Sequence, residues 1–225
     1  MKIISIDDRL KSIASLVSKC DVIADVGTDH GYLPIYLIQN NIANFAFATD
    51  VAASPLASAK ENIAKYGLES KFKTILCDGL TKLPKNVDTV IIAGMGGNLM
   101  IDILENKKFE YKTYVLQPNL HHYALRKYLM EHNYTIVDEK ITYANKKYYE
   151  IFKVVKGKQQ LSELQLTFGP INLEKKEKLF IDKWEEVIGK LNKVLENFKG
   201  NETEYNRIKN EITTIENVIN GTIAE

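Results

Sequence analysis

The 225-residue chain combines 45% hydrophobic with 26% charged residues and has a formal net charge of +1. Its length allows one domain of about 150 residues plus an appendage. The near-zero net charge excludes a positive potential over the whole surface, whereas a local basic patch is still possible. No apolar run approaches the roughly 18 residues of a membrane span, and residues 1–9 do not resemble a signal peptide, so we expect a cytoplasmic protein. Cys20 and Cys77 lie far apart without ligand-spaced His or Cys neighbours, which argues against a disulfide framework and a zinc site.

Residues 5–17 carry apolar side chains at helical spacing and predict a helix ahead of the first strand. Arg9 is the one arginine of this helix. It is either an ordinary surface charge or a group that reaches the following turn or an RNA phosphate.

A strand followed by a glycine turn is the central motif of the chain. Residues 22–26 are typical of a strand buried on both faces, as in a parallel sheet. Gly27 and Gly31 permit backbone angles or close approaches that a Cβ would obstruct, and Pro34 is tolerated in the first turn of the next helix. The unpaired N–H groups of the helix start and the acidic end of the strand therefore suit a polar or charged ligand.

The turn differs from the Gly-x-Gly-x-x-Gly motif of dinucleotide sites, because Asp29 stands where the second glycine belongs. A carboxylate there would repel a pyrophosphate, whereas it would attract the sulfonium or amine of S-adenosylmethionine. The alternative is that Thr28 and Asp29 only cap the helix.

The next two predicted strands, residues 45–50 and 73–77, also end next to acids, Asp50 and Asp78. Parallel strands bring their carboxyl ends to one edge of the sheet, where ligands bind. We predict that Asp50 accepts hydrogen bonds from ribose hydroxyls, although it can also cap the helix at residues 55–66. The sequence Asp78-Gly79-Leu80 can hold the exocyclic amine of an adenine and cover a ring face, or it is an ordinary turn.

Two further strands precede polar or glycine-rich segments. The strand at residues 87–93 leads into Gly94-Met95-Gly96-Gly97, which either lets a flat group approach the backbone or is a flexible loop. The strand at residues 113–116 ends in Gln117-Pro118-Asn119, whose amides can recognise a base edge. His121 and His122 then begin a helix, and as sequence neighbours they point in different directions, so we expect no metal site.

The remaining segments set the fold class. Residues 134–141 and 148–155 alternate in polarity and predict an antiparallel hairpin that closes the sheet. Five βα units followed by such a hairpin indicate an α/β fold of the class I methyltransferase type, with a Rossmann-like, mostly parallel sheet of seven strands.

From about residue 156 the pattern becomes a helical repeat with a heptad seam on each side of Gly200-Asn201. This spacing predicts an antiparallel coiled-coil helical hairpin, with 11 basic and 12 acidic residues from residue 156 onward. A projecting arm suits a large substrate or a dimer better than a small molecule. The seam positions are Phe180, Trp184, Val187, Leu191, Val194, Phe198, Tyr205, Ile208, Ile212, Ile215 and Ile219.

Four motifs resemble the bacterial tRNA (adenine(22)-N1)-methyltransferase family. They are the turn at residues 25–34, Ala-Gly-Met-Gly-Gly at 93–97, Gln-Pro-Asn at 117–119 and Tyr-Tyr-Glu-Ile at 148–151. The resemblance implies a catalytic domain at residues 1–156 and a coiled-coil, tRNA-contacting domain at 157–225. It also implies transfer of a methyl group from S-adenosylmethionine to N1 of adenine 22 in tRNA.

The resemblance assigns residues to the cofactor and to the tRNA. It also implies that the protein binds no metal and is a monomer. Asp29 is expected to assist electrostatically or to place the cofactor, and Asn119 to orient the base. The Asn-Pro-Pro-Tyr motif of the wider methyltransferase pattern does not follow the fourth strand. Because unpaired adenine N1 already carries an in-plane lone pair, positioning of the base can suffice for catalysis. The cofactor set is Asp25, Gly27, Thr28, Asp29, His30, Gly31, Asp50, Val51, Asp78, Gly79, Leu80, Ala93 and Gly94; the substrate set is Arg9, Met95, Gly96, Gly97, Gln117, Pro118 and Asn119.

Two alternatives remain open on the sequence alone. One is a methyltransferase that acts on another RNA or on a small metabolite, which would not require the arm. The other is a non-enzymatic RNA-binding protein, which would not bind the cofactor.

Overall fold

The computed structural model describes residues 3–222 and contains a seven-stranded sheet in the order β3-β2-β1-β4-β5-β7-β6. Neighbouring strands from β3 to β5 are parallel, and β7 is antiparallel to both β5 and β6. This topology confirms the predicted fold class. The strands are β1 (Cys20–Val26), β2 (Ala43–Asp50), β3 (Phe72–Leu76), β4 (Thr89–Gly96), β5 (Thr113–Leu120), β6 (Tyr134–Ala144) and β7 (Lys147–Lys156).

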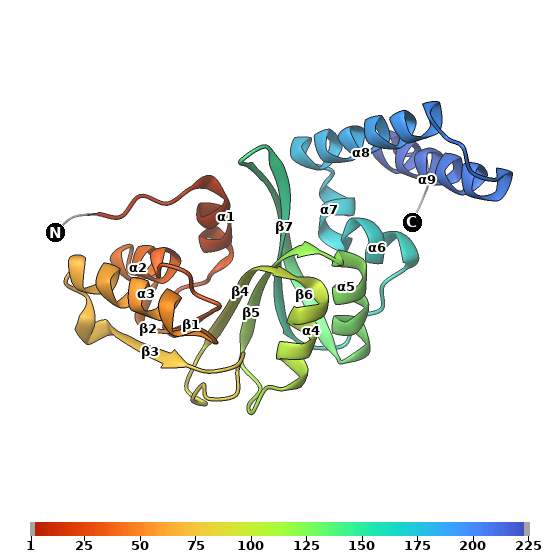
Figure 1. Ribbon diagram of the computed structural model, residues 1–225. Helices are drawn as coiled ribbons and strands as arrows, with labels where there is room; N and C mark the ends of the chain where they lie inside the picture. The colour runs from red at the N-terminus through yellow and green to blue at the C-terminus, as the bar shows by residue number, and fades with distance from the viewer. Residues whose placement is uncertain (1–2, 223–225) are drawn as a thin grey trace.

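Helices cover both faces of the sheet, and two more extend away from it (Figure 1). Asp7 caps the first helix by accepting from the N–H of Leu10, and Gly31 precedes the second in a left-handed conformation. The helices are α1 (Asp8–Leu16), α2 (Tyr32–Gln39), α3 (Ala53–Lys65), the 3₁₀ helix η1 (Glu69–Lys71), α4 (Gly97–Glu105), α5 (His122–Glu131), α6 (Glu163–Phe168), α7 (Pro170–Lys175), α8 (Lys178–Glu196) and α9 (Glu202–Asn220).

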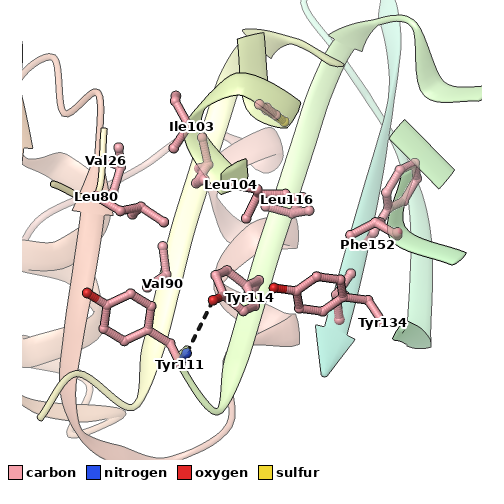
Figure 2. Packing of buried hydrophobic residues seen from close by; sticks show 14 of the residues in the cluster. Val26, Leu80, Val90, Ile103, Leu104, Tyr111, Tyr114, Leu116, Tyr134 and Phe152 are labelled. Atoms are coloured by element: carbon pink, nitrogen blue, oxygen red, sulfur yellow. Dashed lines mark hydrogen bonds between the residues drawn. The ribbon is translucent and has the colours of Figure 1, made fainter. Parts of the chain in front are cut away.

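The central strands are buried on both faces, as their continuous apolar sequences predict. In β1, Ile23 packs with the side chains of α1 and α2, whereas Ala24 packs with those of α4 and α5. Figure 2 shows the second of these clusters, in which Leu80 lies among the fully buried side chains. The sheet is therefore a rigid support whose carboxyl edge is the place where polar residues gather.

β4 and β5 continue into the segments that the sequence predicts to follow them. β4 continues through Gly96 and β5 through Leu120, so the glycine-rich segment is paired backbone with register shifts at Met95, and not a loop. Gly94 has φ +79°, a backbone conformation that a residue with a side chain could adopt at this position only with strain. The bulge turns the end of β4 away from regular pairing next to the carboxyl edge.

The C-terminal helices differ in detail from the predicted hairpin. The link between α8 and α9 spans residues 197–201, so it is longer than the two-residue break predicted, and α6 and α7 are not predicted. Val218 is buried where Ile219 was expected, and Val194 and Tyr205 are exposed. The two long helices pack on one another, while a coiled-coil geometry stays a prediction.

A buried ion network fixes the base of this helical arm to the sheet. Arg126 of α5 is fully buried between Glu139 of β6 and Glu150 of β7, and Lys183 of α8 also pairs with Glu150. The Arg126 guanidinium donates further to two carbonyls of α6, at 3.2 and 3.3 Å. Although burial opposes ionisation, Lys183 and Arg126 hold the pKa of Glu150 far below its usual range.

Within residues 3–222, no helix has both the length and the apolarity to cross a membrane. The same part of the chain holds no group of three His, Cys, Asp or Glu side chains that could bind a metal ion. Cys20 and Cys77 are free thiols, the first half-buried and the second buried.

Candidate active site

A pocket of about 430 Å³ opens at the carboxyl edge of β1 and β4. It is lined by nine of the residues predicted from the sequence, which come from α1, the end of β1, the glycine turn and β4. These are Arg9, Asp25, Gly27, Thr28, Asp29, His30, Gly31, Ala93 and Gly94. Asp7, Leu10, Tyr32 and Leu33 also line the pocket and were not predicted. Tyr32 and Leu33 belong to the motif at residues 25–34, which could have marked them, whereas no motif marks Asp7 and Leu10.

The turn after β1 is built around two glycines in the left-handed region. Gly27 has φ +74° and Gly31 has φ +70°, so an L-residue at either position would be strained. The N–H groups of Gly27 and Thr28 both donate to Thr49 O, at 2.8 and 2.9 Å, which ties the turn to β2. A Cβ on Gly27 would overlap the methyl group of Met95, so Met95 lies directly against the turn.

Asp25 is the buried acid of the pocket, with 8% of its surface exposed. Burial raises the pKa of its carboxyl to about 6, although the Thr28 hydroxyl and the charge of Arg9 favour the ionised form. The nearby Asp50 carboxylate adds to the increase. A cation bound beside Asp25 would relieve the cost of this buried negative charge.

Asp29 and His30 lie at the open side of the pocket. The Asp29 carboxylate is 79% exposed and lies 3.2 Å from His30 Nε2. The His30 ring stacks on Tyr32 with a centroid separation of 5.2 Å. This arrangement leaves the Asp29 carboxylate accessible from solvent beside the glycine turn.

The three strand-terminal acids follow neighbouring strands, as predicted, because β3, β2 and β1 are adjacent in the sheet. Asp50 Oδ1 accepts from the N–H of Ala52 at 2.7 Å, which stabilises the turn before α3, but Asp50 does not cap this helix, because its N-cap is Ala52 and no side chain caps it. Asp78 and Val51 are exposed. Leu80 is fully buried in the core, so its side chain is not available to cover an adenine ring.

A chain of hydrogen bonds joins α1 to the ends of β4 and β5. Arg9 Nη1 donates to Gln117 Oε1 at 2.8 Å, and Gln117 Nε2 donates to Asn119 Oδ1 at 3.1 Å. Asn119 Nδ2 then donates to Gly94 O at 2.7 Å. Gln117 is fully buried, so it supports Arg9 and Asn119 from behind and does not itself face the open site.

The glycines at the end of β4 and the start of α4 serve different purposes. Gly97 is buried, and a Cβ there would approach His121 O to 2.6 Å, so this glycine allows α4 to begin against the backbone between β5 and α5. Gly96 has open space where a Cβ would be. Pro118 is buried, whereas Gly94 and Asn119 are exposed and Met95 and Gly96 are half-buried.

Comparison with known proteins identifies the family. A model of the TrmK family, described as tRNA (adenine(22)-N(1))-methyltransferase, matches residues 23–217. The chain belongs to this family.

Relatives in the family match nearly the whole chain. The tRNA (adenine(22)-N(1))-methyltransferase of Bacillus subtilis (strain 168) is 31% identical over 220 residues, covering 93% of this chain and 92% of that protein. Streptococcus pneumoniae Sp1610 in complex with S-adenosyl-L-methionine has a TM-score of 0.86 at 34% identity, covering 96% of this chain and 100% of that one. M. capricolum TrmK with S-adenosyl-homocysteine has a TM-score of 0.84 at 35% identity, covering 96% and 98%.

Proposed function

We propose that this protein transfers a methyl group from S-adenosylmethionine to N1 of adenine 22 in tRNA. The observation that carries the proposal is the buried Asp25 beside a glycine turn, in a chain that belongs to the TrmK family. Two of its relatives are named as bound to S-adenosyl-L-methionine or its product.

The residues of the pocket fit this cofactor by their chemistry. Asp25 is a buried carboxylate that suits the ammonium group, and the neighbouring Arg9 suits a carboxylate. Asp50 keeps Oδ2 without a protein donor among residues 3–222, so it can accept from a ribose hydroxyl. The exposed Asp78, with the backbone of Val51 and Gly79, is proposed to bind the adenine end.

When bound, S-adenosylmethionine supplies a methyl group on a positively charged sulfur. Unpaired adenine N1 already has an in-plane lone pair, so no proton has to be removed before the new N–C bond forms. The protein's task is therefore to orient the base and to stabilise the positive charge that develops on the ring.

We assign these two tasks to exposed polar groups at the pocket mouth. The amide of Asn119, fixed by Gln117 and Gly94 O, orients the base, and the accessible carboxylate of Asp29 stabilises the charge. The methyl group of Met95, a residue of the segment assigned to the base, lies against Gly27 of the cofactor turn.

We propose that the protein acts as a cytoplasmic monomer and that residues 157–225 contact the tRNA. The test is transfer of a labelled methyl group to tRNA transcripts, followed by digestion to nucleosides. We expect 1-methyladenosine; label in another nucleoside, or in small molecules only, would overturn the proposal. Replacing residues 191–207 by a short Gly-Ser linker should lower tRNA methylation while S-adenosylmethionine binding persists, whereas a small-metabolite enzyme would keep its activity.

A further inference from the structure

The tip of the β6–β7 hairpin extends past the sheet at the edge that carries the pocket. β7 pairs with β5 only from Thr113↔Val155 to Leu116↔Phe152, whereas its pairing with β6 continues to Ala144↔Lys147. The tip therefore lies beyond the last pairs of the sheet, on the side where the parallel strands end.

Figure 1 shows this tip between α1, whose Arg9 lines the pocket, and α8 of the helical arm. On one side, Arg9 lies over the ring of Tyr149, with 5.7 Å from Cζ to the ring centroid. On the other side, Tyr148 packs against the apolar cluster formed with α8 and α9. A large substrate that reaches both the pocket and the arm must pass this hairpin.

The backbone of the tip contains a lysine in an unfavourable conformation. Asn145 and Lys146 have φ +50° and +61°, the pair of left-handed residues that a type I′ turn requires. Asparagine tolerates this region, and glycine is favoured at the second position, whereas a lysine there is strained. The turn thus carries a cation where the backbone alone would favour glycine.

Lys146 and its neighbour Lys147 are exposed, and neither has an ion-pair partner within residues 3–222. The acids of α8 that lie near Tyr148 are Asp182 and Glu186. They pair with Lys178 at 2.7 Å and with Lys190 at 2.5 Å, respectively, which leaves the two lysines of the tip unneutralised.

We propose that the hairpin tip, residues 145–147, binds the sugar-phosphate backbone of the tRNA between the methylated adenine and the part that contacts the arm. This inference rests on the proposed function. Ammonium groups on a stiff, solvent-exposed turn suit phosphate oxygens, and such contacts add affinity without reading sequence. In a chain of net charge +1, local cations of this kind must supply the attraction to the polyanion.

The test compares Lys146→Gly with wild type for tRNA affinity, measured by titration at several salt concentrations. Because glycine removes the strain, we expect a melting temperature equal to or above that of wild type. Because a cation is lost, we expect weaker tRNA binding, and the salt slope, which is the slope of log affinity against log salt concentration, should be reduced in magnitude by about 1. Lys146→Arg, which keeps the charge, should bind as wild type does. Lys147→Gln should weaken binding in the same way as Lys146→Gly.

Lys85→Gln is the matched control for Lys147→Gln, because Lys85 is also an exposed lysine but lies with the starts of β1 and β5, at the edge of the sheet opposite the hairpin tip. It should leave the salt slope unchanged. Equal binding by Lys146→Gly and wild type, or an equal loss of binding in Lys85→Gln, would overturn the inference. If wild type itself fails to methylate tRNA, the proposed function fails instead, so the two failures are distinguishable.

Discussion

The guanidinium of Arg9 donates to the buried amide of Gln117 at 2.8 Å, across 108 positions of sequence. Arg9 lines the pocket beside Asp25, and Gln117 in turn donates to Asn119 at the end of β5. The contact therefore connects the proposed cofactor side of the site with the proposed base side, through an amide that solvent does not reach.

Replacing Gln117 by Leu should release both partners. Because Arg9 and Asn119 would lose a fixed orientation, we expect kcat for tRNA methylation to fall by about 10²-fold, with a much smaller change in S-adenosylmethionine affinity. Asn119→Ala should cause a similar fall in kcat. The fold-loss of kcat in the double variant should be smaller than the product of the fold-losses in the two single variants. Independent effects in this double-mutant cycle would show that Gln117 does not act through Asn119.

Asp25→Asn should separate stability from cofactor binding. The folded-state pKa of Asp25, about 6, lies above its ordinary value of 3.8, so ionisation of Asp25 costs stability as pH rises through this window and the full cost applies above pH 6. Without cofactor at pH 8, Asp25→Asn should therefore melt at a higher temperature than wild type. Calorimetry should detect no binding of S-adenosylmethionine to the variant. A lower melting temperature or retained affinity would contradict this role.

The same pKa predicts the pH dependence of cofactor binding in wild type. Because the ionised carboxylate attracts the cation, S-adenosylmethionine affinity should decrease as pH falls below about 6. Isothermal titration between pH 5 and pH 8, corrected for unfolding, measures this directly. A flat profile would mean that Asp25 does not contact the cationic end.

Asp29→Ala should strongly reduce the single-turnover rate of methylation, because it removes the accessible carboxylate at the pocket mouth. His30→Ala, which removes the partner at 3.2 Å but keeps the carboxylate, is the matched control and should be less harmful. Rapid-quench measurement with saturating cofactor gives both rates. An undiminished rate in Asp29→Ala would remove this residue from the mechanism.

Arg126→Met should destabilise the protein by about 3–5 kcal/mol, because Glu139 and Glu150 would be left buried without their shared cation. Lys175→Met, which breaks the half-exposed pair with Asp138 at 3.3 Å, should cost less than about 1 kcal/mol. Urea denaturation measures both free energies of unfolding. Equal costs would mean that the buried network does not hold the base of the arm.

The sheet was predictable because each strand is a continuous or alternating apolar run with a polar or glycine-rich end. The gathering of Asp25 and Asp29 at one pocket also follows, once the strands are parallel, whereas the sequence left open whether Arg9 reaches it. What could not be predicted depends on contacts distant in sequence. Leu80 faces the core and Gly97 faces a backbone carbonyl. Neighbouring elements decide which side of a turn is buried, so the local sequence alone does not predict it.

The charged network of Arg126 was also not predicted, since its acids come from two strands whose pairing brings them together. The Tyr-Tyr-Glu-Ile run contains one of them, Glu150. This acid binds the base of the arm, and the tyrosines before it contact Arg9 on one side and the arm on the other.

The central claim is that N1 of a single tRNA adenine receives the methyl group, and one pair of transcripts tests it. The two transcripts are identical except that position 22 holds adenine in one and 1-deazaadenine, with CH in place of N1, in the other. We predict that the first accepts a labelled methyl group and the second accepts none, although both bind the protein. Equal labelling of the two transcripts would contradict the account.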